Sequence, residues 1–324
     1  MSDSGAAVPQ GAQGVHEGAE IAVPTGAGRI VVTDELTSQQ VHDVLGILDA
    51  AAAADGRQAV SEQGRLQLRG GRRPGVQHLL LSAGGVLAGY GQLEGTDPVE
   101  APAAEFVVHP EQRRNGYGRA LGDALLAESG HRLRVWAHGG HPAARHLARL
   151  LGLALFRELR QLRMPLTGAD LPNPQLPAGV TVRTFRPGED DAAWLALNAA
   201  AFAHHPEQGS LTQRDLEDRK SEPWFDPHGF FLAERGGELV GFHWTKVHSA
   251  EQVGEVYVLG VAPSEQGAGL GKALTSLGLR YLAYDRSMPT AMLYVDADNV
   301  AAVTVYERLG FRTHETDLMY RTEG

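Results

Sequence analysis

Two glycine-rich loops carry the residues in this chain that are best suited to chemistry. One runs Arg113-Arg114-Asn115-Gly116-Tyr117-Gly118, and the other runs Gln266-Gly267-Ala268-Gly269-Leu270-Gly271. Each follows Val-x-Pro at the end of an apolar, β-branched run and leads into a helical pattern. Glycine lets the backbone approach a ligand closely, and the amides at a helix N-terminus attract negative charge. We therefore predict that each loop binds a phosphate or pyrophosphate group.

The positions of the glycines exclude two better-known phosphate loops. A nucleotide-binding P-loop requires Gly-x-x-x-x-Gly-Lys-Ser/Thr. The second loop contains Gly271-Lys272, but Gln266 and Ala273 stand where that pattern needs a glycine and a hydroxyl. The dinucleotide pattern Gly-x-Gly-x-x-Gly fails in both loops, because Leu121 and Leu274 replace its third glycine.

Further matches follow the two loops along the chain. Leu151-Gly152-Leu153 resembles Leu309-Gly310-Phe311, and Ala143-Ala144 resembles Ala301-Ala302. Two matching blocks in the same order indicate a duplicated domain, whose repeated unit is a strand, an amide-rich loop and a helix.

Hydrophobic periodicity predicts the same order of elements in each half, with an early hairpin at a Gly-Gly pair. In the first half we predict strands at 78–82, 86–93, 103–108, 132–137 and 156–164, and helices at 36–54, 116–129 and 142–151. In the second half we predict strands at 181–185, 230–234, 239–247, 255–261 and 291–295, and helices at 190–201, 269–282 and 300–309. Each half is therefore predicted to be mixed α/β with an antiparallel start.

The composition divides the chain into a tail, two domains and a linker. Residues 1–28 are rich in Gly, Ala, Ser and Gln without an apolar period, so we predict a disordered tail. Residues 165–178 are rich in proline and are predicted to be the linker. Domains of ordinary size then occupy residues 29–164 and 179–324.

Composition and charge also limit the classes of function. A net charge of −10 argues against a broad nucleic-acid surface, although Arg113, Arg114 and Arg119 form one local basic site. The absence of cysteine excludes disulfides and thiolate chemistry, and the 14 histidines follow no metal-site spacing. No apolar run of about 18 residues and no secretory signal are found. We therefore expect a cytoplasmic monomer that binds no metal, nucleic acid or membrane.

Arg/Gln-x-x-Gly-x-Gly after Val-x-Pro, together with the segment from Asn299 to Phe311, resembles the GCN5-related N-acetyltransferases. The resemblance covers both halves. It implies two tandem folds, each a mostly antiparallel mixed sheet with a splayed β-loop-α site for acetyl-CoA. In the second half it implies contacts to acetyl-CoA from Leu259, Gly260, Val261, Gln266, Gly267, Ala268, Gly269, Leu270, Gly271, Lys272, Asn299, Val300, Ala301, Ala302, Val303 and Thr304. In the first half it implies contacts from Phe106, Val107, Val108, Arg113, Arg114, Asn115, Gly116, Tyr117, Gly118 and Arg119.

The same resemblance implies the reaction. Open backbone amides on the strand before the loop polarise the thioester carbonyl, which a neutral amine attacks. Glu255 stands where the family has its general base, and Tyr306 stands where it has the acid that protonates the leaving thiolate. On residue type alone, Glu255 is an ordinary solvated side chain and Tyr306 an ordinary packing residue.

The first half lacks this acid–base pair. Aligned on the loops, Glu255 corresponds to Pro102, and aligned on the last helix, Tyr306 corresponds to Ala148. Glu105 is the nearest substitute, but it lies three residues out of register and is predicted on the opposite strand face. We therefore predict one catalytic half and one degenerate half that still holds CoA.

Further segments, among them Trp224-Phe225-Asp226-Pro227, closely resemble the mycothiol synthase family, which is a fused pair of acetyltransferase domains. That resemblance implies a thiol-sugar substrate, cysteine-glucosamine-inositol, acetylated on its cysteinyl amine. Contacts to this substrate are implied for Glu62, Glu207, Lys246, Glu255 and Tyr294. Carboxylates and an ammonium suit a substrate that carries hydroxyls and an amine.

Two alternatives stay open. The first keeps the chemistry but uses another amine, such as an aminoglycoside, a polyamine or a peptide N-terminus. The second is a CoA-binding sensor without turnover, which would need neither Glu255 nor Tyr306.

Overall fold

One mixed sheet runs through both halves of the molecule. The computed structural model describes residues 20–22, 28–69, 71–96 and 99–323, with the side chains of residues 206 and 207 left out. Within these ranges thirteen strands pair in the order β1-β2-β3-β4-β5-β6-β13-β7-β12-β11-β10-β9-β8. The strands are β1 Glu20–Ala22, β2 Gly28–Thr33, β3 Val76–Ala83, β4 Val86–Glu94, β5 Ala103–Val108, β6 Arg134–Ala137, β7 Leu153–Pro165, β8 Val180–Thr184, β9 Phe230–Arg235, β10 Glu238–His248, β11 Val253–Val261, β12 Thr290–Asp296 and β13 Arg312–Thr322.

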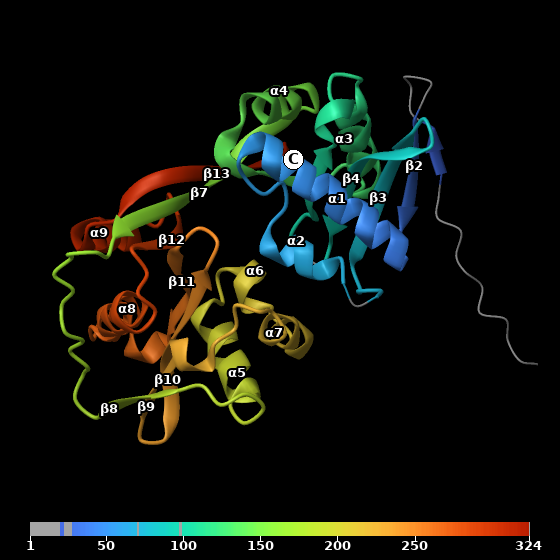
Figure 1. Ribbon diagram of the computed structural model, residues 1–324. Coiled ribbons are helices and arrows are strands. Elements are labelled where there is room, and N and C mark those ends of the chain that lie inside the picture. Colours follow the sequence, from blue (N-terminus) through green and yellow to red (C-terminus); the bar gives the residue numbers. More distant parts are fainter. Residues whose placement is uncertain (1–19, 23–27, 70, 97–98, 324) are drawn as a thin grey trace, which may run out of the picture.

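The first lobe packs helices on both faces of β2–β6 (Figure 1). Helix α1 (Ser38–Asp55) begins at a capping box formed by Thr37 and Gln40 and covers one face. Helices α3 (Tyr117–Glu128) and α4 (Pro142–Leu150) cover the other. Strand alternation explains the division, because Leu80 packs toward α1 whereas Leu79 and Leu81 pack toward α3. The short helix α2 (Glu62–Gln67) lies on the α1 side and faces the second lobe.

The second lobe repeats this arrangement. Helix α5 (Asp191–Ala201) covers one face, where Trp194 packs against Phe230 and Trp244, and α6 (Pro206–Gly209) and α7 (Gln213–Lys220) follow it. Helices α8 (Leu270–Arg280) and α9 (Val300–Leu309) cover the opposite face. A single π-turn, Tyr281–Asp285, ends α8.

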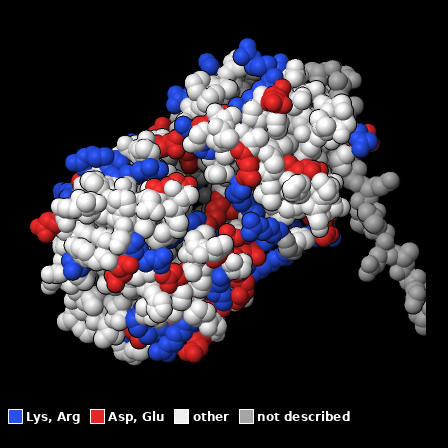
Figure 2. Space-filling view, in the orientation of Figure 1, with Lys and Arg blue, Asp and Glu red and all other residues white. Residues whose placement is uncertain are grey.

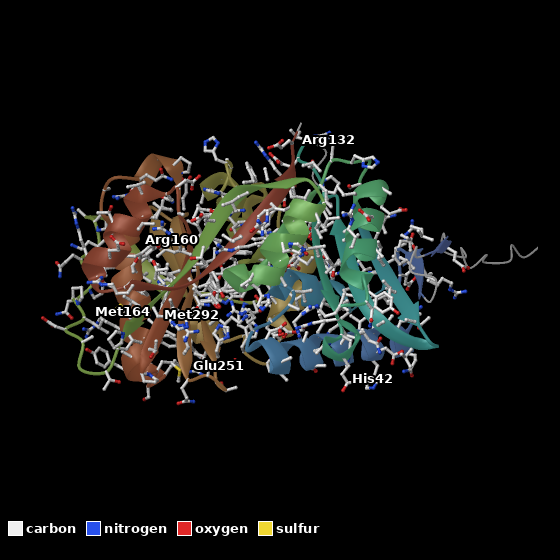
Figure 3. All side chains as sticks on the ribbon, turned by 90° about the horizontal axis from the view of Figure 1, so that it is seen from above. His42, Arg132, Arg160, Met164, Glu251 and Met292 are labelled. Carbon is white, nitrogen blue, oxygen red and sulfur yellow. The ribbon has the colours of Figure 1, made fainter. Side chains whose placement is uncertain are left out.

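The last strand of each lobe pairs with a strand of the other lobe. Strand β13, at the end of the chain, pairs with β6 of the first lobe, and β7 pairs with β12 of the second. The two exchanged strands also pair with each other along Leu153–Arg163. Figure 3 shows β7 crossing the middle of the molecule, where Met164 pairs with Ala291, the neighbour of Met292 on β12. The two predicted halves are therefore joined in one sheet, which fixes one lobe relative to the other.

Most predicted elements are confirmed, including both hairpins, where Gly84-Gly85 and Gly236-Gly237 take positive φ. Six helices and strands of the described residues were not predicted, and β2 and α6 are two of them. Helix α2 has six residues, α7 has Leu216 as its single buried apolar side chain, and β13 is largely charged, so none shows a strong apolar period. The strand Glu20–Ala22 corrects the predicted tail at those three residues, because they pair with Arg29–Val31. Residues 1–19 and 23–27 of that tail lie outside the described ranges.

Candidate active site

The strand that precedes each glycine-rich loop separates from its parallel neighbour. Strand β11 pairs with β12 only from Val253 to Glu255, although it stays paired with β10 as far as Val261. Strand β5 pairs with β6 only at Ala103 and Ala104. Beyond these points each sheet opens, so the splayed arrangement expected from the resemblance is confirmed in both lobes.

The opened strands expose alternate backbone amides. The amide of Ala262 donates to Val240 on β10, so strand alternation turns the amides of Leu259 and Val261 toward the opening. The amide of Gly260 then faces β10. Its missing side chain leaves room for Phe242, whose ring carbon would lie 2.5 Å from a Cβ at this position. Of Leu259, Gly260 and Val261, which were predicted to contact acetyl-CoA, Leu259 and Val261 therefore direct their amides into the opening and Gly260 does not.

The two loops have the same backbone shape despite different residues. Gly267 and Gly269 have φ of 82° and 86°, and Arg114 and Gly116, at the equivalent positions, have φ of 70° and 82°. Left-handed residues two positions apart direct successive amides to one side, and the helix dipole adds positive potential there. Each loop is therefore built to receive an anion through its backbone.

The loop side chains are largely engaged with the protein itself. Arg113 donates two hydrogen bonds to Asp55, at 2.7 and 2.8 Å, which holds the pKa of that carboxyl below its usual value. Arg119 pairs with Asp123, and Tyr117 is buried in the core. Leu270, which corresponds to Tyr117, is buried as well. Lys272 and the loop residues 266–269 are exposed.

Helix α9 borders the opening beside β12. Asn299 caps the helix by accepting a hydrogen bond from the Ala302 amide at 3.1 Å. Val300 and Ala301 are exposed, whereas Val303 is buried in the core. The exposed first turn of α9 is thus the part of this segment available to a ligand.

Glu255 lies at the point where β11 and β12 separate. Its neighbours on the sheet are Lys246 on β10 and Met292 on β12, so all three side chains project from the face that α5 covers. The carboxylate is buried and accepts a hydrogen bond from His248 Nε2 at 2.6 Å. Tyr294, two residues after Met292, projects from the same face.

Tyr306 lies on the opposite face of the sheet. It packs with the buried cluster under α8 and α9 and makes an edge contact with Phe311 at 5.8 Å between ring centroids. Burial raises the pKa of the Tyr306 phenol above its ordinary value. The splayed opening therefore separates the predicted base from the predicted acid.

A β-bulge corrects the predicted correspondence between the lobes. Trp244 pairs with Val258 and Thr245 pairs with Val256, which leaves Tyr257 as an extra residue in β11. Strand β5 has no such insertion, so Glu255 corresponds to Ala103 and not to Pro102. Glu105 then lies two residues from that position, on the same strand face. The prediction that Glu105 lies on the opposite face was therefore wrong.

Glu62 reaches this face of the second lobe from α2 of the first. One carboxylate oxygen pairs with the Lys246 ammonium, and the other accepts a hydrogen bond from the Tyr257 hydroxyl at 2.7 Å. Burial opposes ionisation of Glu62, but Lys246, Tyr257 and Arg219 together hold its pKa below the ordinary value. Of the residues predicted to contact the substrate, Glu62, Lys246, Glu255 and Tyr294 thus lie on one face of the second lobe. The side chain of the fifth, Glu207, lies outside the described atoms.

Sequence reasoning missed the residues that support this group. Lys246 lies over the ring of Trp224 at 4.5 Å and near that of Tyr257 at 5.2 Å. Gln161, from the exchanged strand β7, donates to the Tyr294 hydroxyl at 2.8 Å. Burial and the nearby Glu255 charge raise the pKa of Tyr294 to about 12. Figure 2 shows that the surface is hollowed between the lobes and that acidic and basic side chains lie next to one another there.

No three His, Asp or Glu side chains in the described ranges come together in a way that could hold a metal ion. No helix in the same part of the chain combines the length and apolarity that crossing a bilayer requires.

The fold and the splayed sites define the class of protein. Residues 48–153 and 195–311 each match the acetyltransferase (GNAT) family, so both lobes and most of the chain are covered. The chain belongs to this family, and the two-domain acetyltransferase fold predicted from the loops is confirmed.

Close relatives narrow the class further. The chain is 74% identical to the mycothiol acetyltransferase of Streptomyces avermitilis, over 92% of this chain and 97% of the relative. It is 75% identical to the mycothiol acetyltransferase of Streptomyces coelicolor, over 89% of this chain and 94% of the relative. These relatives confirm the predicted resemblance to the mycothiol synthase family.

Solved structures support the fold alone. A tandem GNAT protein from the clavulanic acid biosynthesis pathway superposes with a TM-score of 0.68 and 19% identity, over 91% of this chain and 98% of that protein. A GCN5-related N-acetyltransferase from Sphaerobacter thermophilus gives a TM-score of 0.63 at 22% identity, over 91% of this chain and 95% of that protein.

Proposed function

We propose that the protein transfers the acetyl group of acetyl-CoA to the cysteinyl amine of desacetylmycothiol, giving mycothiol and CoA. The observation that carries the proposal is the meeting of Glu255, Lys246 and Glu62 beside the splayed strand β11. The names of the close relatives supply the substrate.

The residues present fit acetyl-CoA. The loop of residues 266–271 offers amides to a pyrophosphate, and the free amides of Leu259 and Val261 suit a pantetheine chain that runs along the opened strand. A Cβ at Gly271 would lie 3.7 Å from Val261 and 4.0 Å from Leu259, which are ordinary contacts. Since the protein itself tolerates a side chain there, close approach of a ligand is the better reason for this glycine.

Glu255 is proposed to receive the proton of the amine. An α-amine has a pKa near 7.7 to 8.0, so about a tenth of it is neutral at pH 7. Nitrogen attacks the thioester carbonyl carbon and forms the C–N bond, and the amine proton passes to the Glu255 carboxylate, directly or through a water. The His248 hydrogen bond at 2.6 Å keeps that carboxylate oriented on its strand. The developing oxyanion is stabilised by the open backbone amides of β11.

Tyr306 is proposed to protonate the leaving group. The C–S bond breaks as the tetrahedral adduct collapses, and the thiolate of CoA takes up a proton. A phenol is protonated at neutral pH, and burial raises the pKa of Tyr306 further, so its hydroxyl can donate to the sulfur from the far side of the opening.

The first lobe is proposed to bind CoA without turnover. Its loop has the same backbone shape as the second loop, and β5 opens in the same way. Ala103 and Ala148 stand in place of the base and the acid, and Ala148 is buried in the core. The predicted monomeric state and cytoplasmic location are part of the same proposal.

Initial rates with acetyl-CoA and a panel of amines test the proposed substrate. The cysteinyl pseudo-disaccharide should be acetylated with a kcat/KM at least about 100-fold above an aminoglycoside, a polyamine and a dipeptide. Mass spectrometry after thiol alkylation should place the acetyl group on nitrogen. A better substrate elsewhere in the panel would overturn the choice of amine, and absence of turnover with every amine would favour the sensor alternative.

A further inference from the structure

The carboxylate of Glu62 is held by groups from the other lobe. Its helix, α2, belongs to the first lobe, whereas Lys246 and Tyr257 both lie on strands of the second. These two partners contact different oxygens of the carboxylate. Each oxygen therefore keeps a lone pair with which it can accept a hydrogen bond from a bound substrate.

Arg219 fixes the direction of the hydrogen bonds around Tyr257. Its Nε donates to the Tyr257 hydroxyl oxygen at 2.8 Å, and this hydroxyl lies 2.7 Å from Glu62. A guanidinium can only donate and a carboxylate can only accept, so the single phenolic proton must point to Glu62. The chain from Arg219 through Tyr257 to Glu62 thus has one possible polarity.

Arg219 also ties the helix of Glu62 to the second lobe. Its Nη2 donates to Gln63 Oε1 at 2.8 Å, and its Nη1 donates to the Asp215 carbonyl at 3.0 Å. Only 6% of the residue is exposed. Neighbouring pairs join the same segments, including Arg73 with Asp218 at 2.5 Å. A buried guanidinium on α7 therefore determines where the start of α2 sits.

The β-bulge in β11 determines where Tyr257 lies. Tyr257 is the extra residue in β11, and its ring packs against Trp224 and Trp244 at centroid distances of 5.0 and 5.2 Å. The equivalent stretch of the first lobe has no bulge. The bulge in β11, which β5 lacks, thus directs Tyr257 toward Glu62.

We propose that Tyr257 and Arg219 are positioning residues that hold Glu62 at the substrate face and so set the preference for an amine that carries a hydroxylated sugar. This inference rests on the proposed function and on the contact between Glu62 and the sugar-bearing substrate. Neither residue takes part in proton transfer. Their loss should weaken binding of the sugar-bearing amine and leave the chemical step with a small amine nearly unchanged.

Tyr257→Phe is the direct test, because it removes one hydroxyl and keeps the ring. With the pseudo-disaccharide, KM should rise about 10-fold and kcat should stay within about twofold, as expected for loss of a hydrogen bond to a charged group. With cysteine methyl ester, which has the same amine without the sugar, both constants should stay within about twofold. Arg219→Lys keeps the positive charge but loses the forked set of guanidinium donors, so it should also raise KM for the pseudo-disaccharide.

A double-mutant cycle separates positioning from general damage. If Tyr257 acts through Glu62, then Tyr257→Phe should change KM by less than about threefold in a Glu62→Gln background. Tyr281→Phe is the matched control, because it removes a 2.6 Å hydrogen bond to Asp226 on the other side of the lobe. It should leave KM and kcat unchanged for both amines.

Two results would overturn this inference and leave the proposed function standing. The first is an unchanged KM for the pseudo-disaccharide in Tyr257→Phe. The second is an equal rise in KM for both amines, with and without Glu62→Gln, which is the result that a purely structural role of Tyr257 would give. A parent protein that does not acetylate the pseudo-disaccharide overturns the proposed function, and this inference with it.

Discussion

Glu105 of β5 accepts hydrogen bonds from both the backbone amide and the hydroxyl of Ser61, each at 2.9 Å. Ser61 is the N-cap of α2 and immediately precedes Glu62. The helix also fits closely around this carboxylate, since a Cβ at Gly64 would lie 2.6 Å from Glu105 Oε2. The first lobe therefore uses Glu105, two residues from the position that corresponds to Glu255, to anchor the helix that carries Glu62.

Glu105→Gln should loosen that anchor. The amide keeps one acceptor but loses the charge that pairs with His138. We expect KM for the pseudo-disaccharide to rise about 3- to 10-fold with little change in kcat, together with a loss of stability of about 1–3 kcal/mol. Steady-state kinetics and urea unfolding measure both. Ser61→Ala, which leaves the His138 pair intact, should raise KM with a smaller loss of stability, and an unchanged KM in both variants would contradict the anchoring role.

His138 makes the stability of the joined lobes depend on pH. Its two ring nitrogens lie 2.7 Å from Glu105 and 3.1 Å from Asp317 on the exchanged strand β13. Burial opposes the charge, but the two carboxylates outweigh it and raise the pKa of His138 from 6.5 to about 10. A raised pKa in the folded state means that this contribution is complete below pH 6.5 and is lost as the pH rises toward 10.

His138→Asn should therefore lower the free energy of unfolding by about 3 kcal/mol at pH 6. The difference between parent and variant should shrink steadily between pH 6.5 and 10. Urea unfolding at several pH values gives this comparison directly. A difference that stays constant across the range would show that His138 is not charged in the folded protein.

Gly278→Ala should destabilise the second lobe, although alanine is usually the better helix residue. The added Cβ would lie 2.0 Å from the ring of His243, which is fully buried and bonded to the Leu274 carbonyl at 2.7 Å. Overpacking of about 1–3 kcal/mol then exceeds the helix-propensity gain of about 1 kcal/mol. Gly46→Ala on α1, where nothing lies within 4 Å, is the control and should stabilise. Thermal unfolding of both variants measures these changes in stability. A rise in Tm for Gly278→Ala would contradict the predicted destabilisation.

Local patterns in the sequence were enough for the glycine-rich loops and the hairpins, whereas Glu255 and Tyr306 came from the family resemblance and stay a prediction as base and acid. Glycine spacing and apolar periodicity are local, so β5 was predicted with its observed bounds of Ala103–Val108. The exchange of β7 and β13 was not visible, because pairing partners far apart in the chain leave no local pattern. Tyr257 and Arg219 were missed for a related reason. A single-residue bulge shifts the alignment of two strands, and α7 carries too few apolar residues to show a period.

The acid and base should differ in their dependence on pH. Glu255→Gln removes the proton acceptor and should lower kcat by roughly 100-fold or more, with partial recovery at high pH, where more of the amine is neutral. Tyr306→Phe keeps most of its packing against Phe311 and should lower kcat by a similar factor without that recovery. Profiles of kcat against pH at saturating acetyl-CoA distinguish the two variants. A parental rate for Tyr306→Phe across the range would leave Tyr306 as a packing residue.

A pair of matched variants tests whether the second lobe alone transfers the acetyl group to nitrogen. Gly271→Val and Gly118→Val place the same side chain at equivalent positions, and neither glycine has a positive φ. In the protein itself the nearest atoms to an added Cβ lie 3.7 Å away at Gly271 and 3.4 Å away at Gly118. The measurement is the rate of N-acetylated product formation by mass spectrometry, in variants whose thermal unfolding matches that of the parent. We expect the rate to fall at least about 100-fold in Gly271→Val and to stay within about threefold of the parent rate in Gly118→Val. Loss of activity from Gly118→Val alone, with Gly271→Val fully active, would contradict it.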